Sequence, residues 1–255
     1  MLQTTQEIRT RGFYGLEPDR LTGTTLAIRP GHCFGVGGAV ILDLPTGGTL
    51  DIGNVGLWGR EASSPFVDGD DVFLYVVGNP TTKEVGVIAS TSLIYTGVTY
   101  PPGFTEYRKH PIALKYRTAF GGLPTFHLGS GSGRIVRYTE ASYSGPHTAI
   151  ANHKTLGVWH TIALAPWLPD SARIAIVETR VRYTSGAAGS AFFRSIGIGG
   201  TGRILGSGTP TSGFDVAERT IRVGSTAANL AIEVQTTGDA DLSLVVLGYE
   251  STEPV

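Results

Sequence analysis

Charged side chains are scarce in this chain of 255 residues, making up 16% of it, whereas a typical soluble domain has about 25%. Acidic and basic residues nearly balance, and the formal net charge is -1. This composition gives no bulk attraction to nucleic acid or to an anionic membrane surface. We therefore expect partners other than nucleic acid, and no insertion into a membrane.

The chain has one cysteine, Cys33, so an intrachain disulfide is excluded. We expect this thiol to fill space in a core. No stretch approaches the roughly 18 apolar residues of a membrane-spanning helix. The opening "MLQTTQEIRT" lacks the apolar segment of a signal peptide. We expect a protein made in the bacterial cytoplasm and released by lysis.

Glycine is abundant, at 36 residues, and long runs of helix-forming residues are missing. Short segments of β-branched and apolar residues instead alternate with turn residues, which favours strands. The clearest predicted hairpin joins residues 72–77 and 85–89, and "QTTGDAD" predicts another hairpin loop near the C-terminus. The sequence therefore predicts an all-β fold.

We expect two antiparallel β-sandwich or jelly-roll-like domains after a short N-terminal arm. The predicted division is an arm at residues 1–24, a base domain at 25–120, a linker at 121–125 and a distal domain at 126–255. The linker is "GGLPT", whose glycines and proline interrupt the strand pattern.

The arm carries arginines beside an aromatic pair. Arg9, Arg11, Phe13 and Tyr14 are the residues that would dock on a larger particle. The alternative is a frayed terminus without a partner.

The segment "YPPGFTEYRKHPIAL" at residues 100–114 stands out for its stiffness. Pro101 and Pro102 fix φ and remove backbone donors, and Gly103 permits a tight turn. Phe104 and Tyr107 would then close the bottom of the first sandwich. We expect a structural corner here rather than a binding loop.

Several motifs resemble chemical sites without their required context. "GIGGTG" matches G-x-G-x-x-G, but the following "RILGSGTPTSG" cannot form the helix that a dinucleotide site needs. No serine lies in a G-x-S-x-G elbow. Carboxylates at Glu140, Asp170, Glu178 and Asp215 are available, but spacing singles out no catalytic pair. We expect no cofactor and no catalytic residues.

Metal sites are also weakly indicated. "DGDD" contains Asp68, Asp70 and Asp71, which suit a solvated turn, with weak calcium binding as the alternative. His147, His153 and His160 lack the usual zinc spacings, although a loop can bring distant ligands together. We expect no metal centre.

One group in the C-terminal half combines aromatic rings with polar groups, the chemistry that binds sugars. Much of it lies on or beside the loop "YSGPHTAIANHK". For Trp159 and Trp167, which flank an apolar strand, the alternative is a place in the core. The candidate glycan-binding residues are Tyr143, His147, Asn152, His153, Trp159 and Tyr183.

The region from about residue 25 to 118 resembles a module of tailed-phage fibre and spike proteins. The pieces that carry the resemblance are "IRPGHCFG", "NVGLWG", "VFLYVVGNPTTKEVGVIASTS" and "YPPGFTEYRKHPIAL". Phe104 stands where the family usually has tyrosine. Residues 126–255 look like the sandwich that often caps such proteins, carried by "WHTIALAPWLPDSARIAIVETRV" and "LSLVVLGYE".

The resemblance implies a non-enzymatic virion surface protein of a phage or gene transfer agent, either a head spike or a tail fibre. It would attach by its N-terminal part to capsid, neck or tail proteins, and bind a bacterial surface polysaccharide with its C-terminal domain. Such proteins work as trimers or pentamers. The alternatives are a purely structural decoration protein, a capsule-degrading enzyme and a secreted carbohydrate-binding module.

Overall fold

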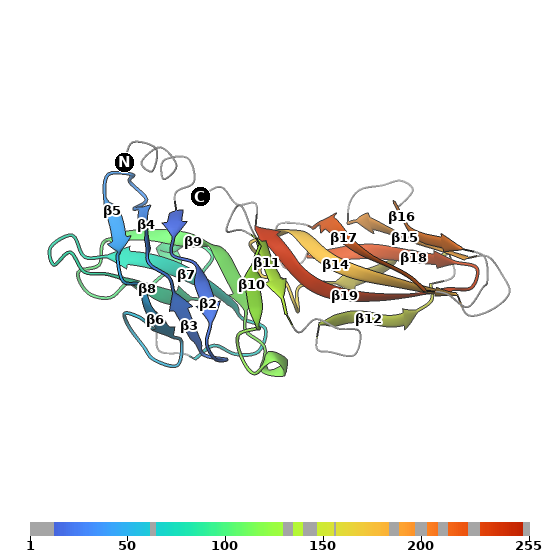
Figure 1. Cartoon of the computed structure of the whole chain (residues 1–255), viewed down its shortest axis with the longest axis horizontal. Coiled ribbons are helices and arrows are strands. Elements are labelled where there is room, and N and C mark those ends of the chain that lie inside the picture. Colours follow the sequence, from blue (N-terminus) through green and yellow to red (C-terminus); the bar gives the residue numbers. More distant parts are fainter. Residues whose placement is uncertain are drawn as a thin grey trace. The chain divides into compact units, whose positions relative to one another are not determined.

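A computed structural model describes residues 13–61, 65–129, 135–139, 147–155, 157–183, 189–196, 203–208, 214–223 and 230–251. The chain divides into two compact units (Figure 1). Unit 1 is Met1–Arg134 with Glu253–Val255, and unit 2 is Ile135–Thr252. Nearly all regular structure in the described residues is antiparallel β, so the all-β prediction is confirmed. No described helix is long and apolar enough to cross a membrane.

Unit 1 is built from small antiparallel sheets. Their strand orders are β1-β4-β5, β2-β3-β6 and β8-β7-β9. The described elements are β1 (Phe13–Gly15), β2 (Pro18–Arg20), β3 (Thr25–Ile28), β4 (Gly31–Phe34), β5 (Ile41–Leu44), β6 (Gly48–Asp51), β7 (Asp71–Gly78), β8 (Val85–Ser90), η1 (Tyr95–Gly97), β9 (Glu106–Lys115), η2 (Thr118–Phe120) and β10 (Phe126–Leu128).

The centre of unit 1 is β7, which is buried on both faces. On one face Phe73, Tyr75 and Val77 belong to a core cluster that includes Phe104. On the other face the alternate residues, such as Leu74, are buried too. This pattern explains the continuous apolar run of "VFLYVV", because a strand covered on both sides needs no polar alternation. The predicted hairpin of β7 and β8 is confirmed.

The double proline leads into a tight turn that positions Phe104. The N–H of Phe104 donates to the Pro101 carbonyl at 3.1 Å, and Gly103 has φ 83°. Proline at the second position and glycine with positive φ at the third are the signature of a type II turn. Phe104 is buried in the core cluster, and Tyr107 packs against it half-buried. The predicted structural corner is confirmed.

Replacing Gly103 by alanine is expected to lower the free energy of unfolding of unit 1 by about 1–2 kcal/mol, because an L-residue is disfavoured at positive φ. A Cβ there would also lie 2.8 Å from Nδ2 of Asn79. Urea denaturation measures the change. Gly37→Ala is the matched control, since no atom lies within 4 Å of its added Cβ. Equal effects of the two substitutions would contradict the turn argument.

The N-terminal residues that are described belong to unit 1. Phe13 pairs with Cys33 and Tyr14 with His32 between β1 and β4. Tyr14 is 51% exposed, so its predicted anchoring role stays a prediction, and Arg9 and Arg11 lie outside the described residues. Cys33 is fully buried, as expected, and burial raises the pKa of its thiol to about 12.

Unit 2 contains two facing sheets. One has the order β11-β19-β14-β17 with β12 on β19, and the other has the order β13-β18-β15-β16. Their inner faces meet where β15 and β18 approach β19. The strands are β11 (Ile135–Tyr138), β12 (Thr148–His153), β13 (His160–Ala163), β14 (Ala172–Tyr183), β15 (Gly189–Ser195), β16 (Arg203–Gly208), β17 (Phe214–Arg222), β18 (Ala231–Thr237) and β19 (Ala240–Ser251).

The chain between β18 and β19 differs from the prediction. The sequence "QTTGDAD" predicts a hairpin, but β18 and β19 belong to different sheets. The tight connection, with Gly238 at φ 60°, therefore carries the chain from one sheet to the other. The described strands form a sandwich-like arrangement, and jelly-roll connectivity stays a prediction.

The division into units falls between residues 134 and 135. The expected linker, residues 121–125, lies within unit 1. Leu123 is fully buried there, and its N–H donates to the Gly23 carbonyl at 2.8 Å. Its own carbonyl accepts from Nε of Arg20 at 2.9 Å. Residues 13–24 of the expected arm likewise contribute β1 and β2 to the sheets of unit 1.

Candidate functional site

The outer face of the sheet β13-β18-β15 gathers aromatic and polar side chains in unit 2. Strand alternation turns Val234 of β18 inward, where it is buried, and leaves Glu233 and Gln235 half-exposed on the other face. Residues directly opposite in antiparallel strands share a face. Glu233 lies opposite Thr161 and Arg194, and Gln235 lies opposite Phe192. We call this surface, with Trp159, the β13–β15 face; its residues are Trp159, Thr161, Phe192, Arg194, Glu233 and Gln235.

Arg194 links the aromatic and acidic parts of this face. The centre of its guanidinium lies 4.2 Å from the centroid of the Trp159 ring. Its Nε donates to Oε2 of Glu233 at 2.5 Å. Both charged side chains are 23% exposed. Arginine stacks well on aromatic rings and keeps further N–H donors in the same plane.

The segment that carries Trp159 is tied to β18. The Gly157 N–H donates to the Thr236 carbonyl at 2.6 Å, and Gln235 Nε2 donates to the Gly157 carbonyl. Two residues earlier in the chain, the backbone N–H of Thr155 donates to the Thr236 hydroxyl at 2.8 Å, and the Thr236 N–H donates to the Thr155 hydroxyl at 2.5 Å. These bonds hold Trp159 in place at the edge of a regular sheet, as a binding site requires.

Among the predicted glycan residues that the structure describes, Trp159 belongs to this face and His153 and Asn152 do not. His153 ends β12 and His160 begins β13, and their rings meet edge to face at 4.9 Å. Trp159 is half-exposed and precedes His160 directly. Asn152 is exposed, with φ 49°, and its N–H donates to Oγ of Ser243 at 2.9 Å. His160 lies opposite Val234, so the His153–His160 contact is on the other side of the sheet from Thr161 and Glu233.

His147 and Tyr183, two further predicted glycan residues, are buried. His147 is 1% exposed, and its ring lies 4.8 Å from that of Tyr138. Tyr183 is 9% exposed, on the inward side of β14, and burial raises the pKa of its phenol. Tyr183 ends β14, and His147 lies in the turn just before β12; both side chains are buried, so neither is part of the β13–β15 face. Tyr143 lies outside the described residues.

Sequence reasoning missed Arg194, Glu233 and Gln235. The strand pattern did contain a signal. In "AIEVQT" the residues from Ile232 to Gln235 alternate apolar and polar, which marks one exposed face on that strand, whereas "SAFFRS" does not alternate. Neither segment indicates, however, that the two strands are neighbours. Only the pairing register of β15 and β18 shows that these residues share a face.

The carboxylates considered for calcium have separate partners. Asp68 accepts from the Thr118 N–H at 2.7 Å and from Nε of Arg117 at 3.2 Å, and these contacts lower its pKa. Asp70 accepts from the Val67 N–H at 2.8 Å. Asp71 accepts from Nζ of Lys115 at 2.7 Å. Within the described ranges, no group of three or more His, Cys, Asp or Glu side chains is arranged to hold a metal ion.

Glu178 and Asp215, which were considered for catalysis, lie in the sheet of β14 and β17 and not on the β13–β15 face. Glu178 lies on β14 opposite Glu218 of β17. Arg137 donates to both carboxylate oxygens of Glu218, at 2.7 and 2.9 Å, and this contact lowers the pKa of Glu218. Asp215 is exposed on β17, and Glu140 lies outside the described residues.

No protein-family model matches the chain, and neither a curated protein nor a solved structure matches it.

Proposed function

We propose that this chain is a non-enzymatic surface protein of a virion, a head spike or tail fibre, which binds a bacterial surface glycan through the β13–β15 face of unit 2. The observation that carries the binding part is the stack of Arg194 on Trp159, joined to the carboxylate of Glu233. The virion part rests on the sequence pieces that resemble phage fibre and spike modules.

The chemistry of the face suits a sugar. An aromatic ring offers its plane to the C–H face of a pyranose, while Arg194, Glu233 and Gln235 supply donors and acceptors for ring hydroxyls. These groups are already held by contacts between adjacent strands, so little side-chain conformational freedom is lost on binding. A single shallow face binds weakly, and display of several copies on one particle would raise the overall affinity by orders of magnitude. A homo-oligomeric trimer or pentamer would supply that valency.

Replacing Trp159 by alanine is expected to weaken binding to purified surface polysaccharide of the host bacterium by at least about tenfold, since aromatic anchors dominate such sites. Biolayer interferometry with immobilised polysaccharide measures the change. Val158→Ala is the matched control, because Val158 is the exposed neighbour of Trp159 and lies outside the face. Equal loss in both variants, or unchanged binding in Trp159→Ala, would reject this face as the glycan site.

Immunogold electron microscopy of particles from a lysate tests the virion part separately. Gold at capsid vertices would indicate a head spike, and gold at the tail tip a fibre. Gold on particles without polysaccharide binding would favour a structural decoration protein. Release of reducing ends from capsule would favour the enzyme instead, and absence of gold from all particles would overturn the virion assignment.

A further inference from the structure

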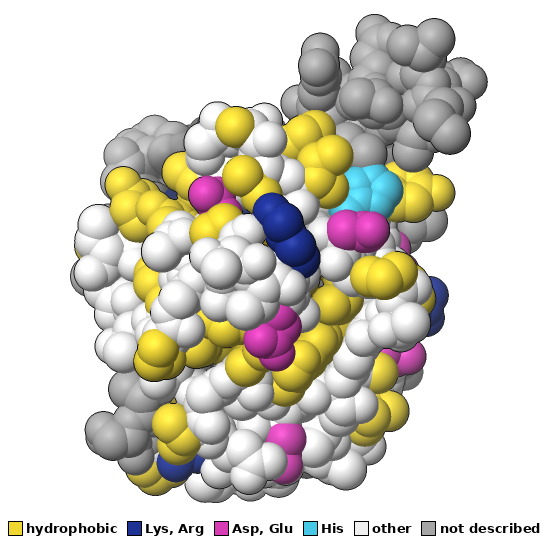
Figure 2. Space-filling model, turned by 90° about the vertical axis from the view of Figure 1, so that its left-hand side faces the viewer, with side chains coloured by type: hydrophobic (Ala, Val, Ile, Leu, Met, Phe, Trp, Pro, Cys, Tyr) yellow, Lys and Arg dark blue, Asp and Glu magenta, His cyan; other side chains and the backbone are white. Residues whose placement is uncertain are grey.

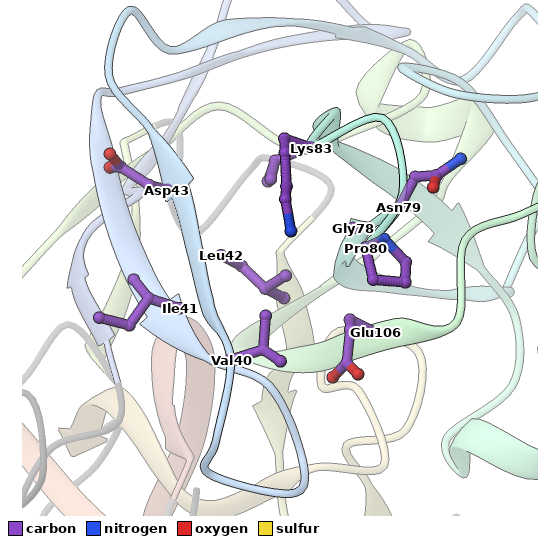
Figure 3. Close-up of a pocket in the computed structure, with 10 residues that line it drawn as sticks. Val40, Ile41, Leu42, Asp43, Gly78, Asn79, Pro80, Lys83 and Glu106 are labelled. Atoms are coloured by element: carbon purple, nitrogen blue, oxygen red, sulfur yellow. The ribbon is translucent and has the colours of Figure 1, made fainter.

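Unit 1 contains a pocket of about 270 Å³ that none of the sequence motifs indicated. It lies between β5 and the hairpin that joins β7 to β8, with the start of β9 on a third side (Figure 3). Figure 2 views the side of the molecule on which β5 lies, and shows hydrophobic side chains in a hollowed strip beside basic and acidic ones. The volume is close to the lower end of small-molecule sites.

The floor of the pocket is apolar. Leu42 is almost fully buried, and it lines the pocket together with Val40, Val85 and Gly78. A Cβ on Gly78 would lie 2.5 Å from a methyl carbon of Leu42, so glycine leaves the floor room. Alternation along β5 turns Asp43 away from the floor, as Figure 3 shows, which leaves its carboxylate outside the mouth.

Opposite charges flank this floor. Lys83 reaches in from the hairpin, and Glu106 lies on the other side of Val40 and Leu42 (Figure 3). In the described part of the chain neither side chain takes part in an ion pair. A cation and an anion that stay apart over an apolar surface are both available to a ligand.

The backbone of the hairpin holds Lys83 in an unfavourable conformation. Lys83 has φ 64°, a region that favours glycine or asparagine. The Asn79 side chain accepts from the N–H groups of Thr81 and Thr82 at 2.9 and 3.1 Å. The Lys83 N–H donates to the Asn79 carbonyl at 2.9 Å. A lysine at a position whose φ suits glycine better is the kind of local strain found at functional positions.

From these observations we infer that the pocket binds a zwitterion whose ammonium and carboxylate groups are joined by an aliphatic segment. The ammonium pairs with Glu106, the carboxylate pairs with Lys83, and the methylene groups cover Leu42, Val40 and Val85. Because the pocket lies in unit 1, this binding is independent of glycan recognition by unit 2.

The test uses the full chain, labelled with nitrogen-15, and 6-aminohexanoate as the probe. Saturable shifts of amide signals from residues 40–43 and 78–85 are expected. Hexylamine and hexanoate each keep one charge and the aliphatic segment, and are expected to bind at least about tenfold more weakly. Equal affinity for all three compounds, or no saturable shift with 6-aminohexanoate, would overturn the proposal.

Substitutions of Lys83 and Glu106 test the role of each charge separately. Lys83→Met is expected to remove the preference for 6-aminohexanoate over hexylamine. Glu106→Gln is expected to remove the preference for 6-aminohexanoate over hexanoate. Glu84→Gln is the matched control, since Glu84 is the exposed neighbour of Lys83 and does not line the pocket. Amide spectra of the free variants that overlay outside the pocket establish intact folding. Unchanged preferences in both pocket variants, or the same loss in Glu84→Gln, would contradict the assignment.

Discussion

Replacing Lys115 by alanine is expected to lower the free energy of unfolding of unit 1 by about 3–5 kcal/mol, because it removes the cation that pairs with the buried Asp71 carboxylate. The two residues face each other at the ends of β9 and β7. Lys115 Nζ and Asp71 Oδ1 are 2.7 Å apart, and the side chains are only 9% and 10% exposed. Urea denaturation measures the loss. Fluorescence of Trp58 reports unit 1 alone when Trp159 and Trp167, which lie in unit 2, are changed to phenylalanine.

A double variant distinguishes loss of the pair from loss of packing. Lys115→Met combined with Asp71→Leu removes both charges, and it is expected to recover most of the stability. The exposed pair Arg29–Glu17, with side chains 61% and 47% exposed, is the control. Breaking it should cost no more than about 1 kcal/mol. A loss in Lys115→Ala as small as that in Arg29→Ala would contradict the buried-pair argument.

Lowering the pH from 6.5 to 4 is expected to destabilise unit 1 by about 3 kcal/mol through His110 alone. Burial lowers the pKa of His110 from 6.5 to about 4. Its Nδ1 also accepts the Ile112 N–H at 3.1 Å, a bond that protonation of this nitrogen would break. The Phe13 ring packs edge-on against the imidazole at 5.1 Å.

The direction follows from proton binding. Above pH 6.5 the imidazole is neutral in both states, and the stability is fully present. As the pH is lowered from 6.5 to about 4, the unfolded chain takes up the proton before the folded protein does, so the free energy of unfolding decreases. Urea denaturation of the parent protein and of His110→Gln at a series of pH values measures the His110 contribution to this pH dependence. His127→Gln, which changes an exposed histidine of the same unit, should keep the parent profile. If His110→Gln showed the same dependence of unfolding free energy on pH as the parent protein, the assignment to His110 would be contradicted.

The fold class could be predicted because local signals agree with it. The run 72–77 and the segment 85–89 became β7 and β8, since β-branched residues on both sides of a polar turn leave few other solutions. The proline pair and Gly103 specify a type II turn by backbone geometry alone, and the residue after it, Phe104, is carried into the core. Cys33 was expected inside and is inside.

The candidate site was less predictable, because it depends on which strands become neighbours. Trp159 and Arg194 are far apart in the chain, and their stack exists because β13 and β15 flank β18. His147 and Tyr183 have suitable chemistry for sugar binding, but the fold buries both side chains. The aspartates of "DGDD" are adjacent in sequence, yet a loop and a strand end direct them to different partners.

By itself the sequence determined the antiparallel β character, the turns at Gly103 and at the β7–β8 hairpin, and the burial of Cys33, because these depend on backbone sterics and hydrophobicity over a few residues. Tertiary structure alone decided that β18 and β19 lie in different sheets, that Arg194 stacks on Trp159, and that Lys83 and Glu106 flank one pocket. The physical reason is that strand pairing order and register are set by long-range packing of complementary faces, which no local pattern encodes.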